Sequence, residues 1–131
     1  MPRILTAARQ VAIGSPPESF TCSWRSGHGA RWATLAGELD ASTALLLEEA
    51  LRDAEADAEL IVVDMRELTF MDCRGMSVVF QSSERLRQSG RRMLVVRGPR
   101  AVDRVFTLTR TAGAMEICDL ESGEPADQVL L

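Results

Sequence analysis

The stretch "LTFMDCRGMSVVF", from Leu68 to Phe80, decides the fold because it marks a change from strand to helix. A continuous apolar run, "LIVVDM" from Leu60 to Met65, comes just before it and is typical of a strand that is covered on both faces. After the stretch, apolar side chains recur at helical spacing as far as Gly90, a typical helix-ending residue. Asp72 lies at the change and is a candidate N-cap. The stretch therefore predicts a strand, a short turn and a helix.

Similar units lie on both sides of this stretch. Before it, two strands, "FTCSW" (20–24) and "RWATLAGEL" (31–39), form a hairpin, and Asp40 can cap the helix that follows. After it come the strand "RRMLVVRG" (91–98), a helix with Pro99 at its first position, and a short strand within "AMEICDL" (114–120). Repeated strand–helix–strand units predict an α/β fold with right-handed crossovers. We expect a mixed, mostly parallel sheet opened by an antiparallel hairpin, with helices packed on it.

Length and composition indicate one domain with its own core, because the chain has 131 residues of which 46% are hydrophobic. We expect residues 1–19, which contain "GSPPES", to be a loose N-terminal extension, residues 20–120 to be the domain, and residues 121–131 to be a tail. No apolar run approaches the roughly 20 residues that span a bilayer. The start of the chain also lacks the apolar segment of a signal peptide. We therefore expect a cytoplasmic protein that does not insert into a membrane.

Several kinds of chemistry are disfavoured by the residues present. The net charge of -4 argues against a nucleic-acid partner, which usually requires a basic face. The cysteines, Cys22, Cys73 and Cys118, form neither a disulfide framework nor a zinc pattern, and the single histidine, His28, has no second ligand spaced with it. The sequence contains no phosphate-binding glycine loop and no nucleophile–histidine pair. We expect no metal, no cofactor and no enzymatic activity.

Three segments together resemble a STAS domain of the bacterial anti-sigma factor antagonist family. They are "LAGELD" (35–40), "LIVVDMRELTFMDCRGMSVV" (60–79) and "RRMLVVRGPRAVDRVFTLT" (91–109), and the resemblance extends over roughly residues 20 to 120. It implies a single STAS-like domain that binds an anti-sigma factor with serine kinase activity and thereby frees a sigma factor. In this family the kinase phosphorylates a serine placed directly after the aspartate of the "FMDS" turn, and the phosphorylated protein lets go.

The resemblance also implies where the partner binds. Asp40 matches an aspartate in a loop beside the phosphorylation site, and Gly75 matches a glycine that lets the second helix approach closely. We expect the partner-binding surface to contain seven residues: Asp40, Asp72, Cys73, Arg74, Gly75, Met76 and Ser77. Within it, we expect Arg74 to pair with Asp72 or Asp40, or else to face a carboxylate of the partner.

The chain departs from the family at Cys73, which occupies the phosphoserine position. A kinase transfers phosphate to a hydroxyl, so a thiol removes the charge switch that phosphate provides at a helix N-terminus. Ser77 and Thr69 lie nearby, but neither matches the family position. Two alternatives remain open: an accessory module of a lipid or small-molecule transport assembly, and a redox sensor centred on Cys73. The particular sigma factor and a homodimeric state also remain open.

Overall fold

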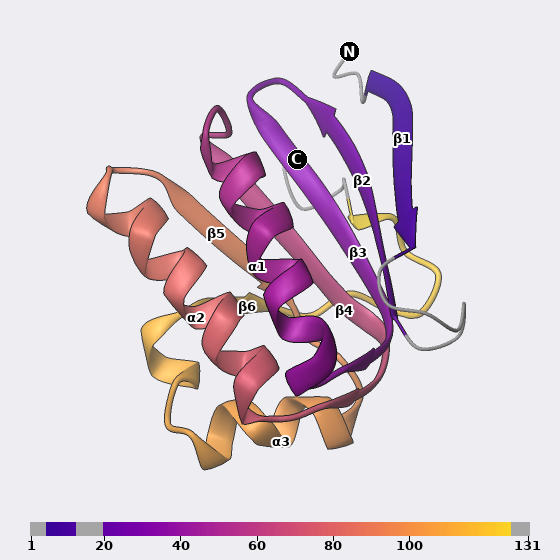
Figure 1. Ribbon diagram of the computed structural model, residues 1–131, viewed down its shortest axis with the longest axis vertical. Coiled ribbons are helices and arrows are strands. Elements are labelled where there is room, and N and C mark those ends of the chain that lie inside the picture. The colour runs from indigo at the N-terminus through magenta and orange to yellow at the C-terminus, as the bar shows by residue number, and fades with distance from the viewer. Residues whose placement is uncertain (1–4, 13–19, 127–131) are drawn as a thin grey trace.

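A computed structural model describes residues 5–12 and 20–126. Its strands form one six-stranded sheet whose spatial order follows the chain (Figure 1). The strands are β1 (Leu5–Ala12), β2 (Phe20–Gly27), β3 (Ala30–Leu39), β4 (Leu60–Met71), β5 (Arg92–Val96) and β6 (Glu116–Cys118). The helices are α1 (Ala41–Glu55), α2 (Cys73–Gln88) and α3 (Arg100–Leu108), followed by a 3-10 turn, η1 (Ala112–Ala114).

The sheet is mixed, as the sequence predicts. β1, β2 and β3 pair in antiparallel order, whereas β3–β4, β4–β5 and β5–β6 are parallel. Figure 1 shows α1 and α2 side by side across one face of the sheet, with α3 below them. The α/β fold with an antiparallel opening hairpin is thereby confirmed.

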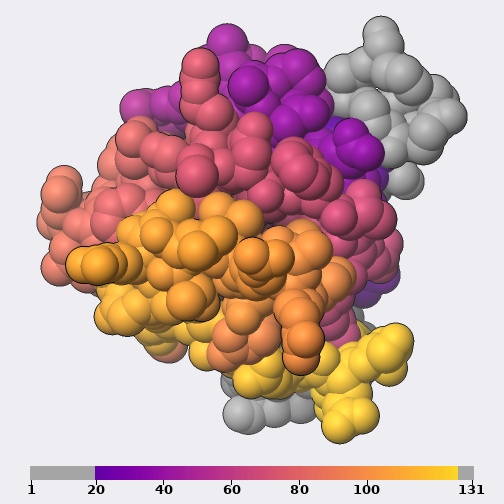
Figure 2. All heavy atoms as spheres, turned by 90° about the horizontal axis from the view of Figure 1, so that it is seen from below, coloured from indigo at the N-terminus to yellow at the C-terminus, as the bar shows by residue number. Residues whose placement is uncertain are grey.

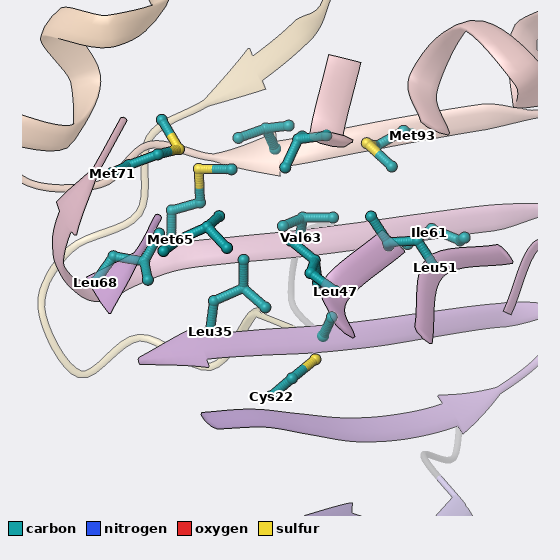
Figure 3. Packing of buried hydrophobic residues seen from close by; sticks show 14 of the residues in the cluster. Cys22, Leu35, Leu47, Leu51, Ile61, Val63, Met65, Leu68, Met71 and Met93 are labelled. Carbon is teal, nitrogen blue, oxygen red and sulfur yellow. The ribbon is translucent and has the colours of Figure 1, made fainter. Parts of the chain in front are cut away.

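The main core lies between the sheet and the two long helices (Figure 3). Leu47 and Leu51 of α1 are fully buried, as are Ile61 and Val63 of β4. Val62, between those two, is also fully buried but belongs to a smaller cluster on the other face of the sheet. Burial on both faces explains why the β4 sequence is continuously apolar rather than alternating.

α1 and α2 are also joined by a buried ion pair near their far ends. Glu55 is 8% exposed, and its carboxylate accepts hydrogen bonds from Arg85 at 2.7 and 2.8 Å and from Ser82 at 2.5 Å. Burial raises the pKa of Glu55, but the hydrogen bonds from Arg85 and Ser82 outweigh that effect and the net pKa is lowered. The ionised carboxylate therefore joins the two helices at this point.

Three boundaries differ from the sequence prediction. Leu5–Ala12 forms β1, an edge strand paired with β2, so the prediction of a loose extension is wrong there; residues 1–4 and 13–19 lie outside the described residues. β4 continues beyond Met65 to Met71 because Leu68 and Met71 are buried and the added residues pair with β3 through irregular register. Pro99 is the N-cap of α3 rather than its first helical residue.

Candidate functional site

The site is formed where two parallel strands end at the same edge of the sheet. Leu39 of β3 and Met71 of β4 are register partners, and each is followed directly by an aspartate, Asp40 or Asp72. The backbone N–H of Asp72 donates to the carbonyl oxygen of Leu39 at 3.1 Å. Since each aspartate is the N-cap of a helix, α1 and α2 begin next to each other at this edge.

Asp72 acts as the cap of α2. Its Oδ1 accepts hydrogen bonds from the backbone N–H groups of Arg74 at 3.0 Å and Gly75 at 3.1 Å. These are two of the N–H groups that a helix leaves without intrahelical acceptors. The sequence prediction that Asp72 caps the second helix is confirmed.

Asp40 makes a larger set of contacts at the start of α1. Its Oδ1 accepts from the N–H and hydroxyl of Ser42 at 2.9 and 2.7 Å and from the N–H and hydroxyl of Thr43 at 3.3 Å each. Thr43 Oγ1 in turn accepts from the Asp40 N–H at 3.0 Å, which completes a capping box. The Ser42 hydroxyl is the main cause of a lowered Asp40 pKa.

Gly75 allows the start of α2 to lie against the end of β3. A Cβ at this position would be 2.5 Å from Leu39 Cγ and 3.0 Å from the Leu39 carbonyl oxygen. Any larger residue would therefore displace either α2 or the residue that precedes Asp40. Gly75 is itself buried, so it sets the spacing of the site.

Met76 differs from the sequence expectation. It is 1% exposed and belongs to the main core, so it cannot offer its side chain to a partner. Its sulfur accepts a hydrogen bond from the Thr111 hydroxyl at 3.5 Å, which brings the segment after α3 against the first turn of α2. Ser77, one residue further on, is half-buried and accepts from Gln81 at 3.2 Å. The apolar periodicity of the helix already puts Met76 on its inner stripe with Val79 and Leu86, and its burial agrees with that pattern rather than with a place on the partner surface.

Cys73 and Arg74 are the exposed residues of this first turn. Among the residues that the structure describes, the Arg74 guanidinium forms no ion pair or hydrogen bond, so the expected pairing with Asp72 or Asp40 is wrong. The physical reason is that both aspartates turn toward the N–H groups of their own helices. The site therefore presents a thiol beside an unpaired cation.

The elements that meet at this edge also carry exposed apolar side chains, which the sequence analysis missed. The large hydrophobic residues that are exposed within the described ranges are Leu45 (62%), Phe70 (46%) and Leu108 (71%). They lie early in α1, at the end of β4 and at the end of α3. Figure 2 looks onto this edge, where the β4–α2 segment lies between α1 and α3. Each of the three lies outside the apolar stripe of its own helix or strand. An apolar residue outside the stripe was the sequence signal that could have predicted this exposure.

The described residues, 5–12 and 20–126, were also compared with the patterns of metal sites, membrane-spanning helices and reactive thiols. This part of the chain contains no group of three metal-ligating side chains and no helix long and apolar enough to cross a membrane. All three cysteines are free. Burial raises the pKa of Cys22 to about 12, and desolvation is also the main cause of a raised pKa at Cys118. Neither is poised to react as a thiolate.

Comparison with known proteins identifies the family. The STAS domain model matches residues 28–121. The anti-sigma-F factor antagonist RsfB of Mycobacterium tuberculosis is 32% identical over 85 residues, which are 64% of this chain and 70% of RsfB. The chain belongs to the STAS domain family of bacterial anti-sigma factor antagonists.

Solved structures support the same fold. An anti-sigma factor antagonist from Mycobacterium paratuberculosis superimposes with a TM-score of 0.74 at 25% identity, over 88% of this chain and 95% of that one. The phosphorylated form of SpoIIAA from Bacillus gives a TM-score of 0.66 at 20% identity, over 82% of this chain and 98% of SpoIIAA. The second likeness concerns the fold alone.

Proposed function

We propose that this protein is a cytoplasmic anti-sigma factor antagonist that binds an anti-sigma factor of the serine kinase type through the edge where α1 and α2 begin. The observation that carries the proposal is the exposed first turn of α2, with Cys73 and Arg74, beside the capped N-terminus of α1. The resemblance of "FMDCRG" to the family's "FMDS" turn supports the match between this turn and the phosphorylated one. Its exposure makes it available to a partner protein.

The surface around the turn has the composition of a protein-binding site. Leu45, Phe70 and Leu108 are apolar and exposed, and exposed apolar side chains beside polar ones are typical of protein-binding surfaces. Arg74 adds an unpaired cation, and arginine is among the residues enriched at interface hot spots. We expect Arg74 to contact a carboxylate of the anti-sigma factor, with Asp40, Asp72 and Ser77 in the polar surround.

The switch is proposed to differ from that of the family. Phosphate on a serine at position 73 would add about two negative charges at the start of α2. Cys73 offers a thiol instead, so the kinase has no hydroxyl to modify at this position. The chain would then bind its anti-sigma factor without being released by phosphorylation there.

The test is incubation of the protein with its partner kinase and ATP, followed by intact mass and peptide mass spectrometry. We expect binding without a phosphate on Cys73. The Cys73→Ser variant is the matched control, because it restores the hydroxyl with little change in size. Stoichiometric phosphate on Cys73 would contradict the proposal, and phosphate on Ser77 or Thr69 would move the switch to another residue. Failure to bind any anti-sigma factor encoded in the host would contradict the proposed partner.

A further inference from the structure

Arginine side chains without a partner gather at and around α3. Most arginines in the described part of the chain pair with carboxylates, and Arg91 donates to backbone carbonyl oxygens. The arginines that form no side-chain ion pair or hydrogen bond within those residues are Arg25, Arg74, Arg100, Arg104 and Arg110, and all of them are exposed. Arg25 lies on β2, whereas the others belong to α3, to the residues just after it and to the first turn of α2. The unpaired positive charge is therefore concentrated in one region of the fold.

α3 has a buried side and an exposed side. Val102 and Phe106 are buried in the main core, one helical turn apart. On the exposed side, Arg100, Arg104 and Leu108 follow one another at the same spacing, which places them along one stripe of the helix. Figure 2 shows α3, in orange, at the surface of the molecule. The helix therefore presents two cations and an apolar side chain together.

Arg74 and Arg110 extend this stripe toward α2. The Thr111 hydroxyl donates to the Met76 sulfur at 3.5 Å, so the segment after α3 touches the first turn of α2. Arg110 directly precedes Thr111, and Arg74 belongs to that first turn. Figure 1 shows the same arrangement, with α3 just below the N-terminus of α2. We call Arg74, Arg100, Arg104, Leu108 and Arg110 the α3 surface.

The carboxylates nearest to this surface are already engaged. Asp103, the acidic residue of α3, pairs with Arg97 at 2.9 Å, and Arg97 also pairs with Asp119 at 2.7 Å. Asp72 accepts from the backbone N–H groups of the first turn of α2. Exposed carboxylates that form no ion pair within the described residues, such as Glu49 on α1, lie on elements other than α2 and α3. A chain with a net charge of -4 therefore keeps a positive surface at α3.

Two of these cations lie where their own helices disfavour them. Arg100 is the first residue of α3, and Arg74 is the second residue of α2. The N-terminal turn of a helix carries partial positive charge, so a cation there lowers the stability of the helix. The first turn of α2 contains no acidic residue that could offset Arg74. Residues that oppose local stability are expected at functional sites, which favours a role for these arginines outside the chain.

We propose that the α3 surface binds an acidic surface of the anti-sigma factor. The inference rests on the proposed function: it extends the contact from the first turn of α2 across α3 and assigns the chemistry of the partner. Carboxylates of the partner accept from Arg100, Arg104 and Arg110, and an apolar side chain of the partner packs on Leu108.

An acidic protein fits this surface better than a nucleic acid or an anionic membrane does. Leu108 is 71% exposed and in line with the arginines, and apolar side chains together with arginine are typical of protein interfaces. The net charge of -4 also repels a polyanion everywhere outside this surface. The partner surface therefore combines carboxylates with an apolar residue.

The experiment measures the affinity of the anti-sigma factor for the full chain by isothermal titration calorimetry at low and at high salt. The double variant Arg100→Gln, Arg104→Gln should raise the dissociation constant about tenfold at low salt, because it removes two interfacial cations. Its affinity should also depend less on salt than that of the wild type, since fewer charges are left to be screened.

Arg25→Gln is the matched control, because Arg25 is also exposed and unpaired within the described residues but lies on β2. It should leave the dissociation constant and its salt dependence unchanged. Urea unfolding controls for the fold. The double variant should be at least as stable as the wild type, because Arg100 opposes the helix dipole.

The outcomes separate this inference from the proposed function. Unchanged affinity of the double variant, beside a wild type that binds, would overturn the inference and leave the proposed function in place. An equal loss for Arg25→Gln would also overturn it, since net charge would then control binding. Failure of the wild type to bind would overturn both. Binding of duplex DNA or phosphatidylglycerol vesicles that requires Arg100 and Arg104, with the anti-sigma factor unaffected, would overturn the inference and assign the surface to a polyanion.

Discussion

The N-termini of α1 and α2 have the same local architecture, but they differ in how many of their polar side chains form hydrogen bonds within the chain. Each follows a parallel strand at this edge of the sheet, and each is capped by an aspartate, Asp40 or Asp72. At α1 the hydroxyls of Ser42 and Thr43 join the backbone in satisfying the aspartate. At α2 the aspartate receives backbone N–H groups, and the next two side chains are exposed. We call the N-terminus of α1 the closed start, because its side chains bond to its own cap. We call the N-terminus of α2 the open start, because its side chains are exposed and available to a partner.

The difference lies in the residues that follow each cap. Ser42 and Thr43 are short side chains with donors that reach back to Asp40. Arg74 and Gly75 occupy the corresponding positions of α2, where the guanidinium forms no hydrogen bond to the cap and glycine has no side chain to offer. Two helix N-termini at one edge also favour negative charge there, which suits a partner carboxylate near Arg74.

The largest expected effect comes from reversing the exposed charge. Arg74→Glu should weaken binding to the anti-sigma factor about 100-fold, because close interfacial charge pairs couple by about 1.5–7 kcal/mol and reversal adds repulsion. Isothermal titration calorimetry would measure this loss. Arg31→Glu is the matched control, since Arg31 lies at the other end of β3 in an exposed ion pair with Asp57. Similar losses for both variants would show that net charge, rather than this turn, controls binding.

A smaller effect, on the stability of the fold, is expected from adding a side chain where the start of α2 lies against the end of β3. Gly75→Ala should destabilise the fold by about 1–3 kcal/mol, because its Cβ would meet Leu39 at 2.5 Å. Urea unfolding gives the free energy directly. Gly113→Ala serves as the control, because a Cβ there meets nothing within 4 Å. Stability unchanged by Gly75→Ala would mean that α2 can shift freely, and that the spacing of the site is not fixed.

Removing each capping aspartate should lower the stability of the fold by a different amount at the two helix starts. Asp72→Ala should cost about 1 kcal/mol, the usual value for an N-cap. Asp40→Ala should cost more, because it also disrupts the contacts with Ser42 and Thr43. Urea midpoints of the two variants check the order. The reverse order would show that the closed start contributes less to stability than its hydrogen bonds suggest.

The smallest effect is the pH dependence of the closed start. The lowered pKa of Asp40 in the folded state means that its ionised form stabilises the protein above the unfolded pKa, near 3.9. That contribution is lost as the pH falls through the folded pKa. The stability difference between the wild type and Asp40→Asn should therefore shrink on acidification below about pH 4. A difference that stays constant in acid would contradict the role given to the carboxylate charge.

Local patterns carried the prediction of the fold and of the caps. The apolar run from Leu60 predicted a strand buried on both faces, and Asp40 and Asp72 were recognised as helix starts because capping depends on neighbouring residues. β1 was missed because Leu5–Ala12 lacks an alternating pattern, and an edge strand depends on pairing with a distant segment. The extension of β4 was missed because Arg66 and Glu67 interrupt its apolar run.

The surface character of the candidate site could not be predicted from the sequence. The resemblance placed the candidate site at the edge where α1 and α2 begin, and that location stays a prediction. The burial of Met76 depends on the segment after α3, whose Thr111 contacts its sulfur. The unpaired state of Arg74 depends on the orientation of two carboxylates that the sequence places near it. These are properties of tertiary contacts and have no local signature.

The measurement that tests the central claim most directly is the affinity of the anti-sigma factor for the wild type, Cys73→Ser and Cys73→Glu, each with and without ATP. Wild type and Cys73→Ser should bind equally without ATP, and ATP should weaken Cys73→Ser alone. Cys73→Glu should bind weakly in both conditions, and the Cys73→Glu, Arg74→Ala double variant should bind more weakly still, because Arg74 otherwise offsets part of the added charge. Equal affinity for all variants would show that the open helix start is not the interface, and a loss of wild-type binding with ATP would show that phosphorylation acts elsewhere in the chain.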